Sequence, residues 1–261
     1  MSEKTREIVH DAPPDLISFI GMEHEQVLRT LRIDPEDMHF VDHIQGLYTA
    51  ATTRIRPKEV ADLIVFQLLT FTHYHFLFST ACFMRCHLAE AFSSLRCAID
   101  GAFVAAHIIH DRASQTAYMD RKKPFDKLLR HYRNLARDRP DRLPHALIPE
   151  LILRHDLCSR YASHADADVF AHRSRIVGDE GSPDAYVTVE YFQFARDKTE
   201  RRLEFLWLLN AFVIVLDVFA SFLHDEQGVV PDAWVTELHG LGAQTERIRD
   251  ELSPDEPGEK R

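Results

Sequence analysis

Two long apolar segments constrain the fold of this chain more than any other feature. The first, VADLIVFQLLTFTHYHFLFSTACFM, covers residues 60–84, and the second, LEFLWLLNAFVIVLDVFASFL, covers residues 203–223. Apolar runs of this length predict long helices, and only 9 glycines in 261 residues argue against an all-β chain punctuated by glycine turns. The first segment is apolar almost all round, which predicts a central helix. The sequence therefore predicts an all-α protein.

Each segment is also long enough to cross a bilayer. Both are interrupted by polar side chains that are costly in lipid but ordinary between the helices of a bundle. These interruptions are Asp62, His73 and His75 in the first segment, and Glu204, Asn210 and Asp217 in the second. We therefore expect a helical bundle and no membrane partner.

The periodicity and the proline positions predict a single bundle of about eight helices. A stretch near residues 176–194 alternates apolar and polar residues, which predicts a short strand pair or an ordered loop. The expected parts are a flexible lead (1–14), a helical pair (15–56), the main bundle (57–224), a C-terminal helix (225–252) and a disordered tail (253–261).

The charge is unevenly distributed. The chain has a net charge of -10, but residues 121–142 contain nine Lys/Arg and three Asp/Glu, a local charge of +6. In the helix predicted here, Arg130, Arg133 and Arg137 share one face, with Lys127 just before them. Guanidinium groups pair well with phosphate oxygens, so this face is a candidate nucleic-acid contact, with an ordinary solvated helix face as the alternative.

The stretch RYASHADADVFAHRS contains a polar ladder. Arg160, His164, Asp168 and His172 are spaced by four residues, so on a helix they follow one slowly turning stripe. At about 100° per residue the stripe winds from solvent at Arg160 into the apolar face at His172. It is either a catalytic or metal site or a polar seam between helices, and its drift around the helix argues against one ion bound by all three His and Asp side chains.

A second polar seam is expected on an earlier helix, where Arg96 and Asp100 are one turn apart. Such a pair either fixes the helix register as an ion pair or forms the charged part of a site. The sequence has no glycine-rich phosphate loop, G-x-S-x-G elbow or H-E-x-x-H motif, so it lacks the signatures of those enzyme classes.

Four cysteines, Cys82, Cys86, Cys97 and Cys158, lie in apolar helical runs without the spacing of zinc ligands. This pattern predicts reduced thiols in a cytoplasmic protein, and the N-terminal residues contain no apolar signal-peptide core.

The segments AEAFSSLRCAIDGAFVAAHIIHD and YASHADADVFAHRS together resemble a group of bacterial helical proteins related to HEPN domains. Arg96 and Asp100 match the Arg and acidic positions of that pattern, with Asp in place of Glu. His172 and Ser174 match its H-x-S. The resemblance covers roughly residues 57–224. Active members carry an Arg and a His separated by four to six residues, whereas three residues separate Arg160 from His164.

This resemblance implies a dimeric helical bundle that binds or cleaves RNA without a metal cofactor, in bacterial stress or phage defence. His172 or His164 would accept the proton of the ribose hydroxyl, because histidine titrates near neutral pH. Arg160 or Arg96 would stabilise charge on the attacked phosphate, with Asp100 beside them. Two alternatives remain open: a noncatalytic interaction or dimerisation module, and a metal-dependent helical-bundle enzyme that uses His and Asp ligands.

Overall fold

The structure is a computed structural model, and part of the chain is described in it. The described residues are 8–10, 13–33, 35–53, 56–161, 174–177, 186–189, 192 and 198–252.

Within these residues the chain is a helical bundle, which confirms the predicted all-α class. The α-helices are α1 (Leu16–Ile33), α2 (Met38–Thr52), α3 (Val60–Met84), α4 (Leu88–His110), α5 (Gln115–Met119), α6 (Leu128–Asp138), α7 (Ile148–Tyr161), α9 (Lys198–Asp217) and α10 (Asp232–Leu252). Short 3-10 turns cover Pro35–Asp37, Arg112–Ser114, Phe125–Lys127 and Pro140–Arg142, and a π-helical turn covers Phe222–Glu226.

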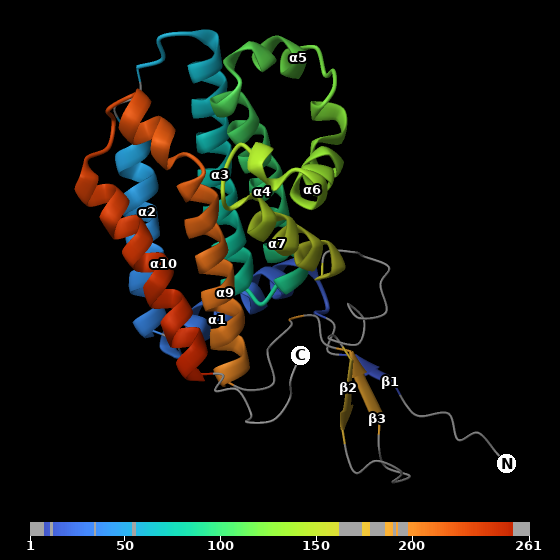
Figure 1. Cartoon of the computed structure of the whole chain (residues 1–261). Coiled ribbons are helices and arrows are strands. Elements are labelled where there is room, and N and C mark those ends of the chain that lie inside the picture. The colour runs from blue at the N-terminus through green and yellow to red at the C-terminus, as the bar shows by residue number, and fades with distance from the viewer. Residues whose placement is uncertain are drawn as a thin grey trace, which may run out of the picture.

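Helices α3 and α4 form an antiparallel hairpin that organises the bundle (Figure 1). Helices α9, α10 and α2 pack on one side of it, whereas α6 and α7 pack against α4 on the other. Helix α9 is almost completely buried, from Phe205 to Leu216 apart from Trp207. The most completely buried helix is therefore α9. Residues 60–84 were expected to form a central helix because they are apolar almost all round, but α3 has one exposed face.

A buried polar network ties three of these helices together. Arg154 of α7 is 3% exposed and donates from Nη2 to Oδ1 of Asn210 in α9 at 2.7 Å. Asn210 in turn donates from Nδ2 to Oγ1 of Thr245 in α10 at 2.9 Å. Buried polar groups that are all hydrogen-bonded fix how helices pack, because any other register would leave them unpaired.

A small sheet accompanies the bundle (Figure 1). Strands β2 (Ser174–Val177) and β3 (Tyr186–Val189) pair antiparallel, with Ser174 opposite Val189, which confirms the strand pair expected near residues 176–194. Strand β1 (Ile8–His10) pairs parallel to β3. Residues 8–10 were expected to belong to a flexible lead, and this expectation is wrong for them because their backbone groups pair with β3.

Candidate functional site

One face of α3 is exposed and carries no charge. We call it the α3 face, and it consists of the eight exposed residues of that helix: Val60, Leu63, Gln67, Thr70, Phe71, Tyr74, Leu77 and Phe78. They recur at helical spacing, and their aromatic members are well exposed, at 42% for Phe71, 59% for Tyr74 and 44% for Phe78. Apolar side chains gathered in this way on a surface mark an interaction site.

The two histidines of this apolar helix flank the α3 face, and the ring of His75 lies 4.3 Å from that of Phe71. His73 contacts Oε1 of Gln45 in α2 through Nε2 at 2.8 Å, and its ring stacks on Tyr48. His75 contacts Oγ of Ser94 in α4 at 2.8 Å. Partial burial lowers the pKa of both histidines, which favours the neutral rings. These histidines hold α3 between α2 and α4, and the α3 face stays exposed between them.

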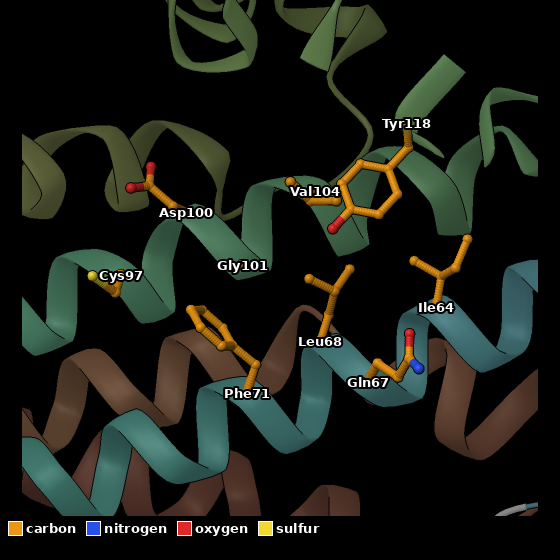
Figure 2. Close-up of a pocket in the computed structure, with 9 residues that line it drawn as sticks. All are labelled: Ile64, Gln67, Leu68, Phe71, Cys97, Asp100, Gly101, Val104 and Tyr118. Carbon is orange, nitrogen blue, oxygen red and sulfur yellow. The ribbon is translucent and has the colours of Figure 1, made fainter. Parts of the chain in front are cut away.

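A pocket lies beside the α3 face, between α3 and α4, with a volume of about 430 Å³ (Figure 2). Tyr118 of α5 closes one side, and its ring points into the space above Leu68. Gly101 is also part of the wall. Its missing side chain lets α4 lie close to Phe71, because a Cβ at this position would lie 3.0 Å from Cδ1 of Phe71. The lining residues are Ile64, Gln67, Leu68, Phe71, Cys97, Asp100, Gly101, Val104 and Tyr118.

Asp100 links the pocket to α7. Its Oδ1 lies 3.4 Å from Nε2 of His155, a side chain that is only 6% exposed. The other ring nitrogen, Nδ1, lies 3.6 Å from Oδ1 of Asp156, and Asp156 pairs with Arg133 of α6. The carboxylate of Asp100 therefore turns toward α7, as Figure 2 shows, and helps to hold α7 against α4.

The thiol of Cys97 also borders the pocket. Burial raises its pKa, and the neighbouring Asp100 acts in the same direction. A raised pKa keeps the sulfur protonated at neutral pH, whereas a nucleophilic cysteine needs the thiolate. Cys97 thus belongs to the apolar wall of the pocket.

The structure brings some of the predicted catalytic residues near one another and leaves others undescribed. Arg96 and Asp100 are both exposed on α4, and the described contact of the Asp100 carboxylate is with His155 of α7 rather than with Arg96. Arg160 is exposed near the end of α7, as its position in the ladder predicted. His164, Asp168, His172 and the rest of the segment 162–173 lie outside the described residues.

The predicted nucleic-acid residues are all exposed, in and just before α6. They are Lys127, Arg130, Arg133 and Arg137. Of these, Arg133 pairs with Asp156, and Arg137 pairs with Asp138 at 2.7 Å. Two of the four positive charges are therefore partly neutralised within the protein.

Among the described residues, no group of three or more His, Cys, Asp or Glu side chains could hold a metal ion. Three described helical segments, Val60–Met84, Leu88–His110 and Lys198–Glu226, are long and apolar enough to cross a membrane by length and composition.

The chain matches no protein-family model, no curated protein and no solved structure.

Sequence reasoning missed His155 and the α3 face. The histidine stands directly after Arg154 in a mixed polar and apolar helix, so only the packing of α7 on α4 reveals its contact with Asp100. The α3 face could not be predicted from composition. A helix that is apolar on all sides gives no sequence signal that tells which of its sides is exposed.

Proposed function

We propose that this protein is a noncatalytic helical interaction module that binds a protein partner through α3 and α4. The observation that carries this proposal is the α3 face, on which all eight exposed side chains are uncharged. A monomer gains nothing from exposing Phe71, Tyr74 and Phe78 together, whereas a protein interface is enriched in such aromatic side chains.

A charged residue beside the α3 face favours a protein over a lipid surface. The side chain of Asp100 lines the pocket next to this face and is 52% exposed. A carboxylate would be costly in the hydrocarbon of a bilayer but is ordinary at the polar rim of a protein interface. In the segment Lys198–Glu226, 83% of the most apolar window is buried inside the protein, so its apolar surface is used by the bundle itself.

The double variant Tyr74→Glu with Phe78→Glu tests this proposal in extracts of cells that express the protein. We expect the wild-type chain to migrate by gel filtration in a complex larger than its own 30.2 kDa, and the double variant to migrate as the free chain. Aromatic anchors of an interface are typically worth about 2 kcal/mol or more each, and burying a charge in their place adds to the loss.

The matched control is Leu153→Glu, since Leu153 is an apolar side chain of α7 that is 55% exposed. This variant should migrate like the wild type. Equal migration of the wild type and the Tyr74/Phe78 double variant would contradict the proposal.

RNA binding is a second candidate function, and the observation that favours it is the basic surface of residues 121–142. This segment contains nine Lys/Arg and three Asp/Glu in a chain that is otherwise acidic. The predicted contact residues in it are exposed. His164 and His172, for which the HEPN resemblance suggests proton transfer, lie outside the described residues. The proposal of RNA binding therefore depends on the basic residues in and just before α6.

The charge-reversal variant Arg130→Glu, Arg133→Glu, Arg137→Glu should bind single-stranded RNA at least about tenfold more weakly at low salt, because phosphate contacts supply most of such binding. Fluorescence anisotropy with labelled RNA measures this affinity. Arg247→Glu, at an exposed position of α10, is the control and should have little effect. Unchanged RNA affinity of the triple variant would exclude this surface as the contact.

A further inference from the structure

The pocket between α3 and α4 has the size and the walls of a small-molecule site. Its volume of about 430 Å³ lies within the range of roughly 300–1,000 Å³ that is typical of ligand pockets, whose walls are mainly apolar and aromatic. Ile64, Leu68 and Val104 supply aliphatic walls. Phe71 and Tyr118 supply aromatic walls. Side chains from three helices, α3, α4 and α5, therefore surround one apolar space (Figure 2).

Both aromatic walls are held from behind by other side chains. The ring of Tyr118 packs edge-on against Phe125, with ring centroids 5.2 Å apart. The ring of Phe71 packs edge-on against His75 at 4.3 Å, and His75 contacts Oγ of Ser94 at 2.8 Å. Rings that are already fixed lose little conformational freedom when a ligand binds, so less binding free energy is lost in ordering them. The pocket is thus preformed for a ligand.

Two hydrogen-bonding groups lie on these apolar walls. Figure 2 shows the hydroxyl of Tyr118 directed toward the space between Val104 and Leu68. The side-chain amide of Gln67 lies on the α3 wall of the same pocket. A tyrosine hydroxyl and a glutamine amide can each donate and accept hydrogen bonds. A ligand with one or two polar groups can therefore bond to the pocket while the rest of its surface stays in apolar contact.

The charge of the pocket excludes anions. Asp100 is the one charged residue among the described residues that line it, and Lys and Arg are absent from them. An anion in the pocket would lose hydration and meet a carboxylate instead of a cation. The Asp100 carboxylate turns toward α7, where it lies 3.4 Å from His155, so it offers no partner to an ammonium group inside the pocket either. An uncharged ligand avoids both costs.

We infer that the pocket binds a small uncharged aromatic molecule, about the size of two fused rings, with one or two hydrogen-bonding groups. Its ring system lies between Leu68 and Val104, and aromatic contacts with Phe71 and Tyr118 add to this burial. Its polar group bonds to the hydroxyl of Tyr118. The inference does not rest on the proposed function, because the pocket binds this ligand in the chain without a protein partner.

Saturation-transfer NMR of the purified full chain with indole-3-carboxamide tests the inference. We expect one site with a dissociation constant of about 1 mM or tighter, as for a fragment of this size in a matching pocket. Indole-3-carboxylate has nearly the same shape but carries a negative charge, and it should bind at least about tenfold more weakly. Asp100→Asn should reduce this difference, because it removes the charge and keeps the size of the side chain.

Two variants locate the probe in the pocket. Val104→Phe fills the space between α3 and α4 and should weaken binding of indole-3-carboxamide at least about tenfold. Tyr118→Phe keeps the ring and removes the hydroxyl, so it should weaken binding about threefold to tenfold, the usual effect of one lost hydrogen bond. It provides a second route if Val104→Phe does not fold. Leu153→Phe, at an exposed position of α7, is the control and should bind like the wild type.

Three outcomes would overturn the inference. One is the absence of probe binding at about 2 mM, which would leave the pocket to the proposed protein partner. Another is wild-type affinity in both Val104→Phe and Tyr118→Phe, since the probe would then bind elsewhere. The last is binding that only Tyr74→Glu with Phe78→Glu abolishes, because the probe would then lie on the α3 face outside the pocket. The proposed function is tested separately by the complex in extracts, so the two can fail independently.

Discussion

Arg154→Ala is expected to lower the free energy of unfolding by about 3–5 kcal/mol, the usual loss when one member of a buried charged network is removed. The guanidinium is almost fully buried and donates to Glu150 at 2.8 Å, to the carbonyl oxygen of Trp207 at 3.2 Å and to Asn210 at 2.7 Å. Alanine leaves these acceptors without their donor and opens a cavity between α7 and α9.

Urea denaturation followed by circular dichroism measures this loss. The matched control is Arg247→Ala, which removes an exposed i,i+4 pair with Glu251 and should change stability by less than about 1 kcal/mol. If Arg154→Ala were as stable as this control, the network would not hold α7 against α9.

Asp62→Ala is expected to lower the free energy of unfolding by about 2–4 kcal/mol, as the sum of a lost helix-end contact and a lost charge-assisted hydrogen bond. The buried carboxylate accepts a hydrogen bond from the backbone N–H of Lys58 at 2.9 Å and one from Nη2 of Arg112 at 2.8 Å. It also lies in the first turn of α3, where a negative charge is favourable to the helix dipole.

Glu59→Ala is the control for Asp62, because its carboxylate is 52% exposed and lies 3.5 Å from the same arginine. The control should lose less than about 1 kcal/mol in the same urea titration. Amide hydrogen exchange should also become faster in the first turns of α3 in Asp62→Ala and stay unchanged in Glu59→Ala. Slow exchange of these amides in Asp62→Ala would contradict the proposed role of Asp62 in starting α3.

Much of the fold could be predicted because helices leave local signals. The last helix was expected to run to about Leu252, and α10 ends there. The ladder was expected to begin in solvent at Arg160, and Arg160 is exposed near the end of α7. What the sequence could not give is the position of each helix in the bundle, because apolar composition alone does not distinguish α9, which is enclosed, from α3, which is not.

The site was harder to predict because it depends on contacts between distant segments. The spacing of Arg96 and Asp100 suggested a pair within α4, but a carboxylate on a helix surface binds whichever group the neighbouring helix presents, and here that group is His155. The pocket likewise requires Tyr118 and Leu68, which are far apart in the sequence. Neither contact has a signature in local spacing.

The most direct test of the central claim, that α3 binds a protein, is photo-crosslinking from the α3 face. The photoreactive amino acid p-benzoylphenylalanine would replace Tyr74 in one variant and Leu153 in another, and adducts would be identified by mass spectrometry after irradiation of expressing cells. We predict a reproducible polypeptide adduct at position 74 and none at position 153. The absence of any protein adduct at position 74, or equal adducts at both positions, would contradict the account.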